Sequence, residues 1–248
     1  MFRSISVPPP LLRTLAAALH LRYHALSQRG SGREGMRNGY GHMVHDEMVA
    51  RVRALCAERA HRLAALETAS DVRSYQEALR PAIARAFRPV PERSPLNARI
   101  TGRVERPAYL IEKVLFESRP GCLVTANLYL PRNLGGPAPC VLGTCGHSAN
   151  GKAAGLYQGF AQRLALSGFV TLIYDPLNQG ERDQYVRLED RAPVAQSTFA
   201  HNMMGKQLEL LGDSLVMWRT WDGMRALDYL LTRPEVDHGR VGVTGNSG

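Results

Sequence analysis

The sequence has no apolar run that approaches the roughly 20 residues with which a helix crosses a membrane. We therefore expect no transmembrane segment and no membrane partner. It also has no internal repeat and no low-complexity tract, which disfavours solenoids and propellers. With 44% hydrophobic residues in a chain of 248, it is long and apolar enough to bury a substantial core.

Cysteines are few, and basic residues are not interleaved with aromatic ones. The four cysteines, Cys56, Cys122, Cys140 and Cys145, lack the spacing of a metal site, so we expect no metal and no other cofactor. Much of the net charge of +9 comes from residues 1–44, which hold six arginines and one acidic residue. The remaining excess is spread among mixed signs, and this pattern argues against a nucleic-acid partner.

The first residues carry no convincing export signal. A weakly apolar stretch over residues 11–21 is interrupted by Arg13 and His20, and no clear cleavage site follows it. We therefore favour a cytoplasmic location, with export as the alternative. The basic composition of residues 1–44 predicts a disordered N-terminal segment.

Residues 45–96 are predicted to form a helical region that ends in a proline-containing linker. Strong helix formers dominate two stretches, residues 45–66 and 70–87. Met48, Val52 and Leu55 follow a helical period, and we expect this stripe to serve packing. The prolines after it mark a boundary before the domain at 97–248.

Residues 97–248 first show strand-like periodicity and then alternate strands with helices. Two strands separated by a Pro-Gly turn signal predict an antiparallel hairpin, at residues 108–116 and 122–130. Strands are predicted at 140–144, 170–174 and 241–244, and helices at 152–167 and 214–232. Short apolar strands separated by helices predict an α/β fold. Its mostly parallel sheet carries helices on both faces and is entered through the antiparallel hairpin.

The helix predicted at 214–232 supports two more detailed expectations. An apolar stripe should face the core, formed by Met217, Trp221, Met224, Leu227 and Leu231. Asp222 and Arg225 are three residues apart and are expected to pair locally.

The segment Gly245-Asn246-Ser247-Gly248 follows the last predicted strand and matches the first four positions of a nucleophile elbow, Gly-x-Ser-x-Gly. An elbow places a serine on a sharp strand-to-helix turn, where glycines give the backbone room to turn. Ser247 is therefore the candidate nucleophile of an acyl-transfer site. The alternative is a serine in an ordinary strand-to-helix turn.

A second loop, from Gly146 to Lys152, directly follows the strand predicted at 140–144. Acyl transfer passes through an oxyanion, and backbone N–H groups at the carboxyl end of a strand can point at it. The candidate donor in this loop is Ala149 or, alternatively, Ser148. We expect His147 to shape the loop, because the histidine of a catalytic triad in this topology follows the serine.

Five segments in this order resemble the α/β-hydrolase superfamily, residues 146–152, 174–182, 221–230, 233–237 and 242–248. The likeness covers about residues 70–248. Within the superfamily, the chain resembles acetyl xylan esterase-like and glucuronoyl esterase-like bacterial serine esterases. The resemblance implies that residues 97–248 are part of an α/β-hydrolase domain and that the substrate is a small ester or an acylated saccharide.

The resemblance also implies roles for individual residues. It makes Ser247 the nucleophile and Ala149 and Gly248 the oxyanion donors. It places further residues in loops beside the pocket, namely His147, Ser148, Asn150, Asp175, Glu181 and Arg182. Asp175 is expected to hydrogen-bond loop backbone, and Glu181 and Arg182 either pair with each other or orient their loop.

The sequence departs from the family pattern at the triad, whose order is serine, then an acidic residue, then histidine. All eight histidines precede Ser247. We therefore expect the printed sequence to be the N-terminal portion of such an esterase, without the triad acid and histidine, and inactive by itself. Two alternatives stay open: a serine peptidase like prolyl oligopeptidase, and a binding module that catalyses nothing.

Overall fold

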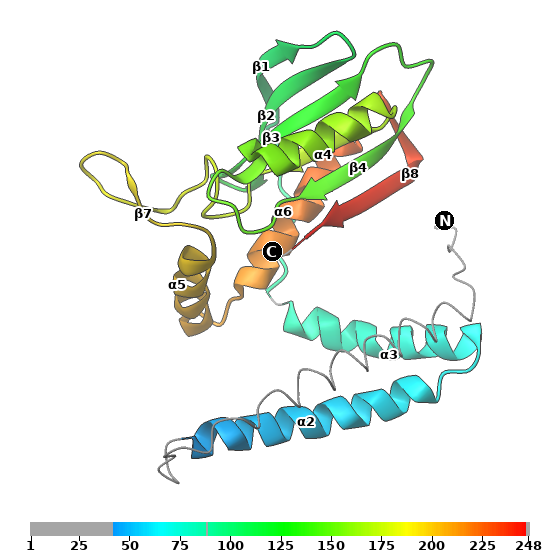
Figure 1. Ribbon diagram of the computed structural model, residues 1–248, viewed down its shortest axis with the longest axis vertical. Helices are drawn as coiled ribbons and strands as arrows, with labels where there is room; N and C mark the ends of the chain where they lie inside the picture. The colour runs from blue at the N-terminus through cyan, green and yellow to red at the C-terminus, as the bar shows by residue number, and fades with distance from the viewer. Residues whose placement is uncertain (1–41, 88, 247–248) are drawn as a thin grey trace, which may run out of the picture. The chain divides into compact units, whose positions relative to one another are not determined.

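A computed structural model describes residues 42–87 and 89–246 of the chain (Figure 1). Most of the predicted disordered segment 1–44 lies outside the described residues, and so do Ser247 and Gly248. The chain divides into two compact units, residues 1–80 and 81–248.

Two helices follow each other at the start of the described chain, α2 (Met43–Ala64) and α3 (Ala69–Ala86). α3 begins in a capping box: Thr68 Oγ1 accepts the N–H of Asp71 at 3.2 Å, and the Asp71 carboxylate accepts the N–H of Thr68 at 2.8 Å. These bonds lower the pKa of Asp71. Neither helix contains a buried residue, so the predicted packing role of the α2 stripe finds no support in the structure.

The second unit contains a six-stranded sheet in the order β1-β2-β3-β5-β4-β8. β1, β2, β3 and β5 pair antiparallel in turn, whereas β5, β4 and β8 are parallel. The strands are β1 (Arg99–Glu105), β2 (Tyr109–Arg119), β3 (Cys122–Pro131), β4 (Ala138–Thr144), β5 (Val170–Tyr174) and β8 (Val236–Gly245). This is the predicted arrangement of a parallel sheet entered through an antiparallel hairpin.

Helices cover both faces of the sheet (Figure 1). Leu172 of β5 joins a core cluster with side chains of α6 (Leu215–Leu230), and its neighbour Ile173 joins a second cluster with side chains of α4 (Gly155–Leu166). Successive side chains of a strand point to opposite faces, so α4 and α6 lie on opposite sides. The predicted α/β architecture is confirmed.

The core-facing stripe predicted for α6 is only partly right. Met217 and Trp221 are buried, but Met224 is 37% exposed. The buried face turns instead toward Asp222, Arg225, Ala226, Tyr229 and Leu230. Because two of these residues, Asp222 and Arg225, are charged yet buried with polar partners, hydrophobicity alone places the face wrongly.

Several elements were not predicted. β1 is an edge strand with mostly exposed, polar side chains, so it lacks the apolar pattern of a buried strand. A short two-stranded sheet and a helix lie between β5 and α6: β6 (Tyr185–Val186), β7 (Pro193–Ala195) and α5 (Ser197–Leu210). No helix among the described residues is long and apolar enough to cross a membrane.

Candidate functional site

The carboxyl ends of the parallel strands β4, β5 and β8 meet at one edge of the sheet, where open α/β sheets bind ligands. The loop after β4 contacts the residue that precedes Ser247. A Cβ at Gly146 would lie 2.5 Å from the Asn246 carbonyl oxygen, and a Cβ at Gly245 would lie 1.8 Å from Thr144 Oγ1. Only glycine fits at either position, so the strand ends approach closely here.

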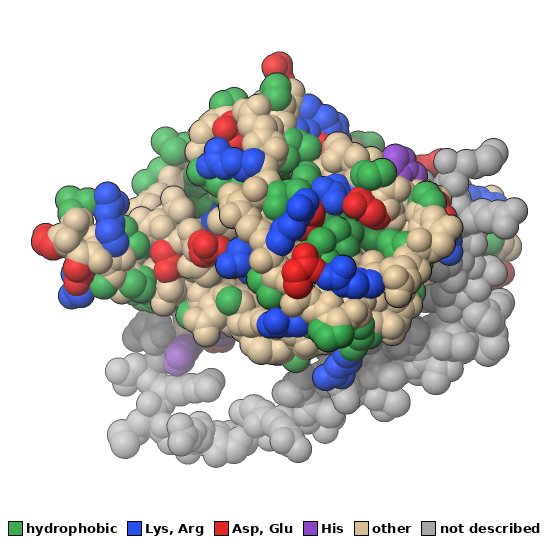
Figure 2. Space-filling view, turned by 90° about the horizontal axis from the view of Figure 1, so that it is seen from above, with side chains coloured by type: hydrophobic (Ala, Val, Ile, Leu, Met, Phe, Trp, Pro, Cys, Tyr) green, Lys and Arg blue, Asp and Glu red, His purple; other side chains and the backbone are tan. Residues whose placement is uncertain are grey.

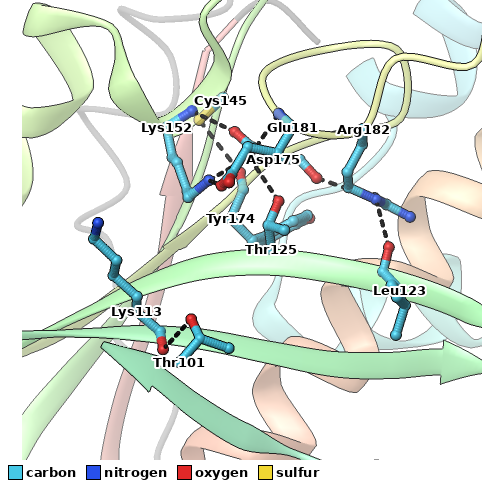
Figure 3. Close-up of polar contacts among 10 residues, drawn as sticks. All are labelled: Thr101, Lys113, Leu123, Thr125, Cys145, Lys152, Tyr174, Asp175, Glu181 and Arg182. Carbon is cyan, nitrogen blue, oxygen red and sulfur yellow. Dashed lines mark hydrogen bonds and ion pairs between the residues drawn. The ribbon is translucent and has the colours of Figure 1, made fainter. Parts of the chain in front are cut away.

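Asp175 follows β5 and is fully buried at this edge (Figure 3). Its carboxylate accepts hydrogen bonds from Thr125 Oγ1 at 2.7 Å and from the Lys152 N–H at 2.8 Å, and it lies 2.5 Å from Lys152 Nζ. A fourth donor is the Glu181 N–H at 3.3 Å. Asp175 therefore connects the loop after β4 to its own loop through backbone and charge together.

Lys152 is the ionic partner of Asp175, a role that was not predicted from the sequence. It is 6% exposed, and its ammonium group also contacts the Glu181 carboxylate, whose side chain is 69% exposed. The sequence does show a lysine at the end of the loop that follows a predicted strand. It does not show that Asp175, 23 residues later, comes within ion-pair distance of this lysine.

Two glycines enclose the Asp175 carboxylate. Gly151 has φ of +50°, and a Cβ there would lie 2.1 Å from Asp175 Oδ1. Gly180 has φ of +61°, and a Cβ there would lie 2.3 Å from the same atom. The left-handed region is open to glycine at little cost, and here the space is closed to any side chain as well.

Arg182 is buried and pairs with Asp222 of α6, with 2.7 Å between Nη1 and Oδ2. It also donates to two carbonyl oxygens, those of Leu123 at 2.9 Å and Asp175 at 3.0 Å. The predicted alternative of a Glu181–Arg182 pair is therefore wrong, because these neighbours turn toward different partners.

The predicted local pair of Asp222 with Arg225 is also wrong. Arg225 bonds Asp228 at 2.6 Å and the Ser94 carbonyl at 2.5 Å. Spacing along a helix identifies possible neighbours, but the partner of Asp222 comes from a loop 40 residues away.

The loop from Gly146 to Ala149 is held by side chains that come from outside it. Tyr157 of α4 accepts the Gly146 N–H at 2.6 Å and donates to Asn246 Oδ1 at 3.2 Å. Gln179 Nε2 donates to the carbonyls of Gly146 and Ser148, both at 2.7 Å. Neither Tyr157 nor Gln179 was predicted from the sequence to have a role here.

The other loop residues named from the sequence lie at the surface of this edge. His147, Ala149 and Asn150 are exposed and Ser148 is half-buried. The Ala149 carbonyl accepts the Gly180 N–H at 2.7 Å, and the Asn150 carbonyl accepts the Ala153 N–H at 3.0 Å. The structure therefore brings the loop after β4 and the loop after β5 together, next to Asn246.

His147 lies against a second histidine from α5, His201, with 5.2 Å between ring centroids. His201 is buried; its Nε2 lies 2.7 Å from the Leu177 carbonyl, and its Nδ1 lies 3.4 Å from Arg219 Nη1. These partners assign the proton to Nε2. Burial lowers the pKa of His201; the bond to Leu177 opposes this shift, and the charges of Arg219 and His147 add to it. The ring is therefore neutral near pH 7.

A cavity of about 580 Å³ opens beside the Asp175 loop. It lies among the β2–β3 turn, the loop after β5, α5 and the start of α6. Its lining includes Leu123, Leu177, Glu181, Arg182, Met204, Leu208 and Trp218.

Within residues 42–87 and 89–246, no cluster of three or more His, Cys, Asp or Glu side chains could hold a metal ion. On the face drawn in Figure 2, basic and acidic side chains are interspersed, without a continuous basic patch.

Comparison with known proteins identifies the fold. Residues 23–248 match the model of the abhydrolase family. An uncharacterized protein of Pseudomonas aeruginosa is 32% identical over 157 residues, which are 62% of this chain and 32% of that protein. This chain thus spans about a third of its curated relative.

Solved esterase structures share the architecture. A provisionally assigned acetyl xylan esterase from Bacteroides fragilis superposes with a TM-score of 0.58 at 23% identity, covering 72% of this chain and 48% of that one. Acetyl xylan esterase 1 from Thermoanaerobacterium sp. JW/SL YS485 gives 0.50 at 21%, covering 66% and 49%. A methylesterase gives 0.55 at 20%, covering 76% and 39%. At these identities the likeness establishes the α/β-hydrolase fold and not the reaction.

Proposed function

We propose, from the premise that this chain belongs to the abhydrolase family, that the protein is a serine-dependent carboxylic ester hydrolase. Its substrates would be acylated carbohydrates or related small esters. The observation that carries the proposal is the restrained loop at 146–149, which contacts Asn246 directly before Ser247. A fixed loop of backbone N–H groups beside a candidate nucleophile is what acyl transfer requires.

In the proposed reaction, Ser247 Oγ attacks the ester carbonyl carbon and its proton passes through a base to the leaving alcohol. The N–H groups of Ala149 and Gly248 hold the oxyanion. Water then attacks the acyl-serine, releases the carboxylic acid and restores the serine. A serine hydroxyl is a weak nucleophile without an adjacent base, so activation of Ser247 is the central test.

The two histidines beside these loops, His147 and His201, do not suit the role of base. Both ring nitrogens of His201 have partners, Leu177 and Arg219. His147 belongs to the loop itself and precedes the serine, against the triad order of this fold. We propose that His147 shapes the loop and that Asp175, with Glu181 and Arg182, supports it.

The cavity beside the Asp175 loop is the proposed place for the part of the substrate that leaves as alcohol. Its volume of about 580 Å³ falls within the usual range for small-molecule sites, about 300–1,000 Å³. Trp218 and Glu181 line the cavity, and this combination of an aromatic ring with a polar group suits a sugar. The acetyl xylan esterases of the same fold support this substrate class.

The test uses protein expressed from the complete gene, with p-nitrophenyl acetate as substrate and a fluorophosphonate probe for activated serine. We expect hydrolysis and labelling, both abolished by Ser247→Ala and retained by Ser167→Ala, a change at an exposed serine after α4. Labelling that survives Ser247→Ala would overturn the assignment. A peptide p-nitroanilide tested in parallel distinguishes an esterase from the peptidase alternative.

A further inference from the structure

Two buried side chains hold the loop at 146–149, and both of them bond Gly146. Gln179 is fully buried and Tyr157 is 8% exposed. Gln179 donates both amide hydrogens to the loop, one to the Gly146 carbonyl and one to the Ser148 carbonyl. Tyr157 receives the Gly146 N–H and reaches on to Asn246.

The contacts of Gln179 determine where the loop's N–H groups point. A trans peptide is planar, and its C=O and N–H point in opposite directions. The Ser148 carbonyl is directed at Gln179 Nε2 and at the Gly151 N–H, 3.0 Å away. The N–H of the same peptide unit, that of Ala149, must therefore point away from Gln179.

The next peptide unit is fixed as well, because the Ala149 carbonyl accepts the Gly180 N–H. Ala149 is thus held on both sides, while its own N–H donates to no group in the part of the chain that the structure describes. An oriented N–H that has no acceptor among the described residues is available to bind an anionic oxygen.

We propose that Gln179 is a positioning residue that presets the Ala149 N–H as an oxyanion donor, with Tyr157 tying the same loop to the segment before Ser247. The proposal rests on the proposed esterase function. Neither residue touches the reacting atoms. Gln179 acts through the backbone of Gly146 and Ser148, and Tyr157 acts through the backbone of Gly146 and the side chain of Asn246.

The amide of Gln179 can take only one orientation here. Turned over, its oxygen would face two carbonyl oxygens, so both hydrogens must point at the loop. As a consequence Gln179 Oε1 is buried without a partner among the described residues. An unpaired buried acceptor lowers the stability of the fold. We therefore assign the two bonds of the Gln179 amide to orienting the loop and not to stabilising the protein.

The decisive variant is Gln179→Leu, which keeps a buried side chain of similar size and removes both donors. The control is Gln158→Leu, because Gln158 also donates to a nearby carbonyl, that of Ala153 at 2.6 Å, outside the 146–149 loop. In protein expressed from the complete gene, we expect Gln179→Leu to lower kcat for p-nitrophenyl acetate about 10- to 100-fold. KM should change less than about threefold, because an oxyanion donor acts mainly in the transition state. Gln158→Leu should change neither constant.

Hydrogen exchange of the peptide covering residues 145–151 gives a second readout that does not depend on activity. We expect faster exchange in Gln179→Leu and in Tyr157→Phe, and parental exchange in Gln158→Leu. If Gln179→Leu does not fold, Tyr157→Phe decides alone, with the same expected loss of kcat, because it removes one hydroxyl and keeps the ring.

The two proposals fail in different ways. A kcat within threefold of the parent, or unchanged exchange in the loop, overturns the role of Gln179 while a Ser247-dependent esterase stands. If exchange rises but the protein hydrolyses no ester, the loop contacts are real, and both the esterase function and the oxyanion role fall.

Discussion

Gly180→Ala offers a sharp test of the site's architecture, because two independent restrictions meet at that position. Its φ is +61°, and an added Cβ would lie 2.3 Å from Oδ1 and 2.4 Å from Cγ of Asp175. No Cβ tolerates such contacts, so either the carboxylate or the turn must move. The backbone N–H that bonds the Ala149 carbonyl is retained in the variant.

The expected loss of stability has two parts. Alanine in the left-handed region costs about 1–2 kcal/mol. Displacing the Asp175 carboxylate separates it from Lys152, and disrupting a buried ion pair costs about 3–5 kcal/mol. Because the carboxylate can retain some of its four contacts after shifting, we expect a further loss of at least about 2 kcal/mol beyond the backbone effect.

Gly168→Ala isolates the backbone effect. Gly168 follows α4 with φ of +85°, and a Cβ added there would meet no atom of the described residues within 4 Å. For a domain of this size, each kcal/mol shifts Tm by about 2–4 °C. We therefore expect Gly180→Ala to melt at least about 4–8 °C below Gly168→Ala when thermal unfolding is followed by tryptophan fluorescence. Equal melting temperatures would show that Asp175 is not wedged against Gly180, and the proposed packing of this loop would be wrong.

Three further predictions concern other parts of the site. Arg182→Met should lower the free energy of unfolding in urea by about 3–5 kcal/mol, because it leaves the buried Asp222 carboxylate unpaired. Adding Asp222→Leu should restore much of this loss, and no recovery in the double variant would contradict the prediction. The pKa of His201 is lowered from 6.5 in the fold, so the unfolded chain binds the proton more tightly and stability falls as pH drops below about 6.5. His201→Gln, which keeps a donor for the Leu177 carbonyl, should lose less Tm between about pH 7.5 and 5.5 than the parent, and an equal loss would show that His201 is not the titrating group. Filling the cavity with Leu208→Trp should raise KM for an acetylated oligosaccharide without slowing fluorophosphonate labelling of Ser247, whereas an unchanged KM would exclude the cavity as the alcohol site.

The elements of the α/β sheet were predictable where one local signal dominates. The strand predicted at 170–174 is β5 to the residue, because every side chain in it is buried and all of them except Thr171 are largely apolar. β1 escaped prediction because an exposed edge strand needs no apolar pattern. Local sequence thus predicts buried strands well, but it predicts poorly which exposed segment pairs as an edge strand.

The site was predictable in its loops but not in its contacts. The sequence directed attention to the loop after β4 and to Asp175, since small and polar residues directly follow apolar strands there. The partners of Asp175, Lys152 and Thr125, come from segments 23 and 50 residues away. No periodicity in the sequence indicates contacts over such a separation. The same limit explains why Asp222 was matched to a neighbour on its helix and not to Arg182.

The buried ion pair and the amide of Gln179 converge on the two peptide units that flank Ala149. Asp175 fixes the Lys152 N–H, directly after Gly151, whose N–H bonds the Ser148 carbonyl at 3.0 Å. Asp175 also crowds Gly180, whose N–H bonds the Ala149 carbonyl. A buried ion pair adds little net stability compared with apolar residues of the same volume, but apolar residues could not accept these backbone hydrogens. We therefore interpret the charge of Asp175 as a means of fixing the ends of the loop. The direction of the Ala149 N–H then depends on residues from three separate segments of the chain.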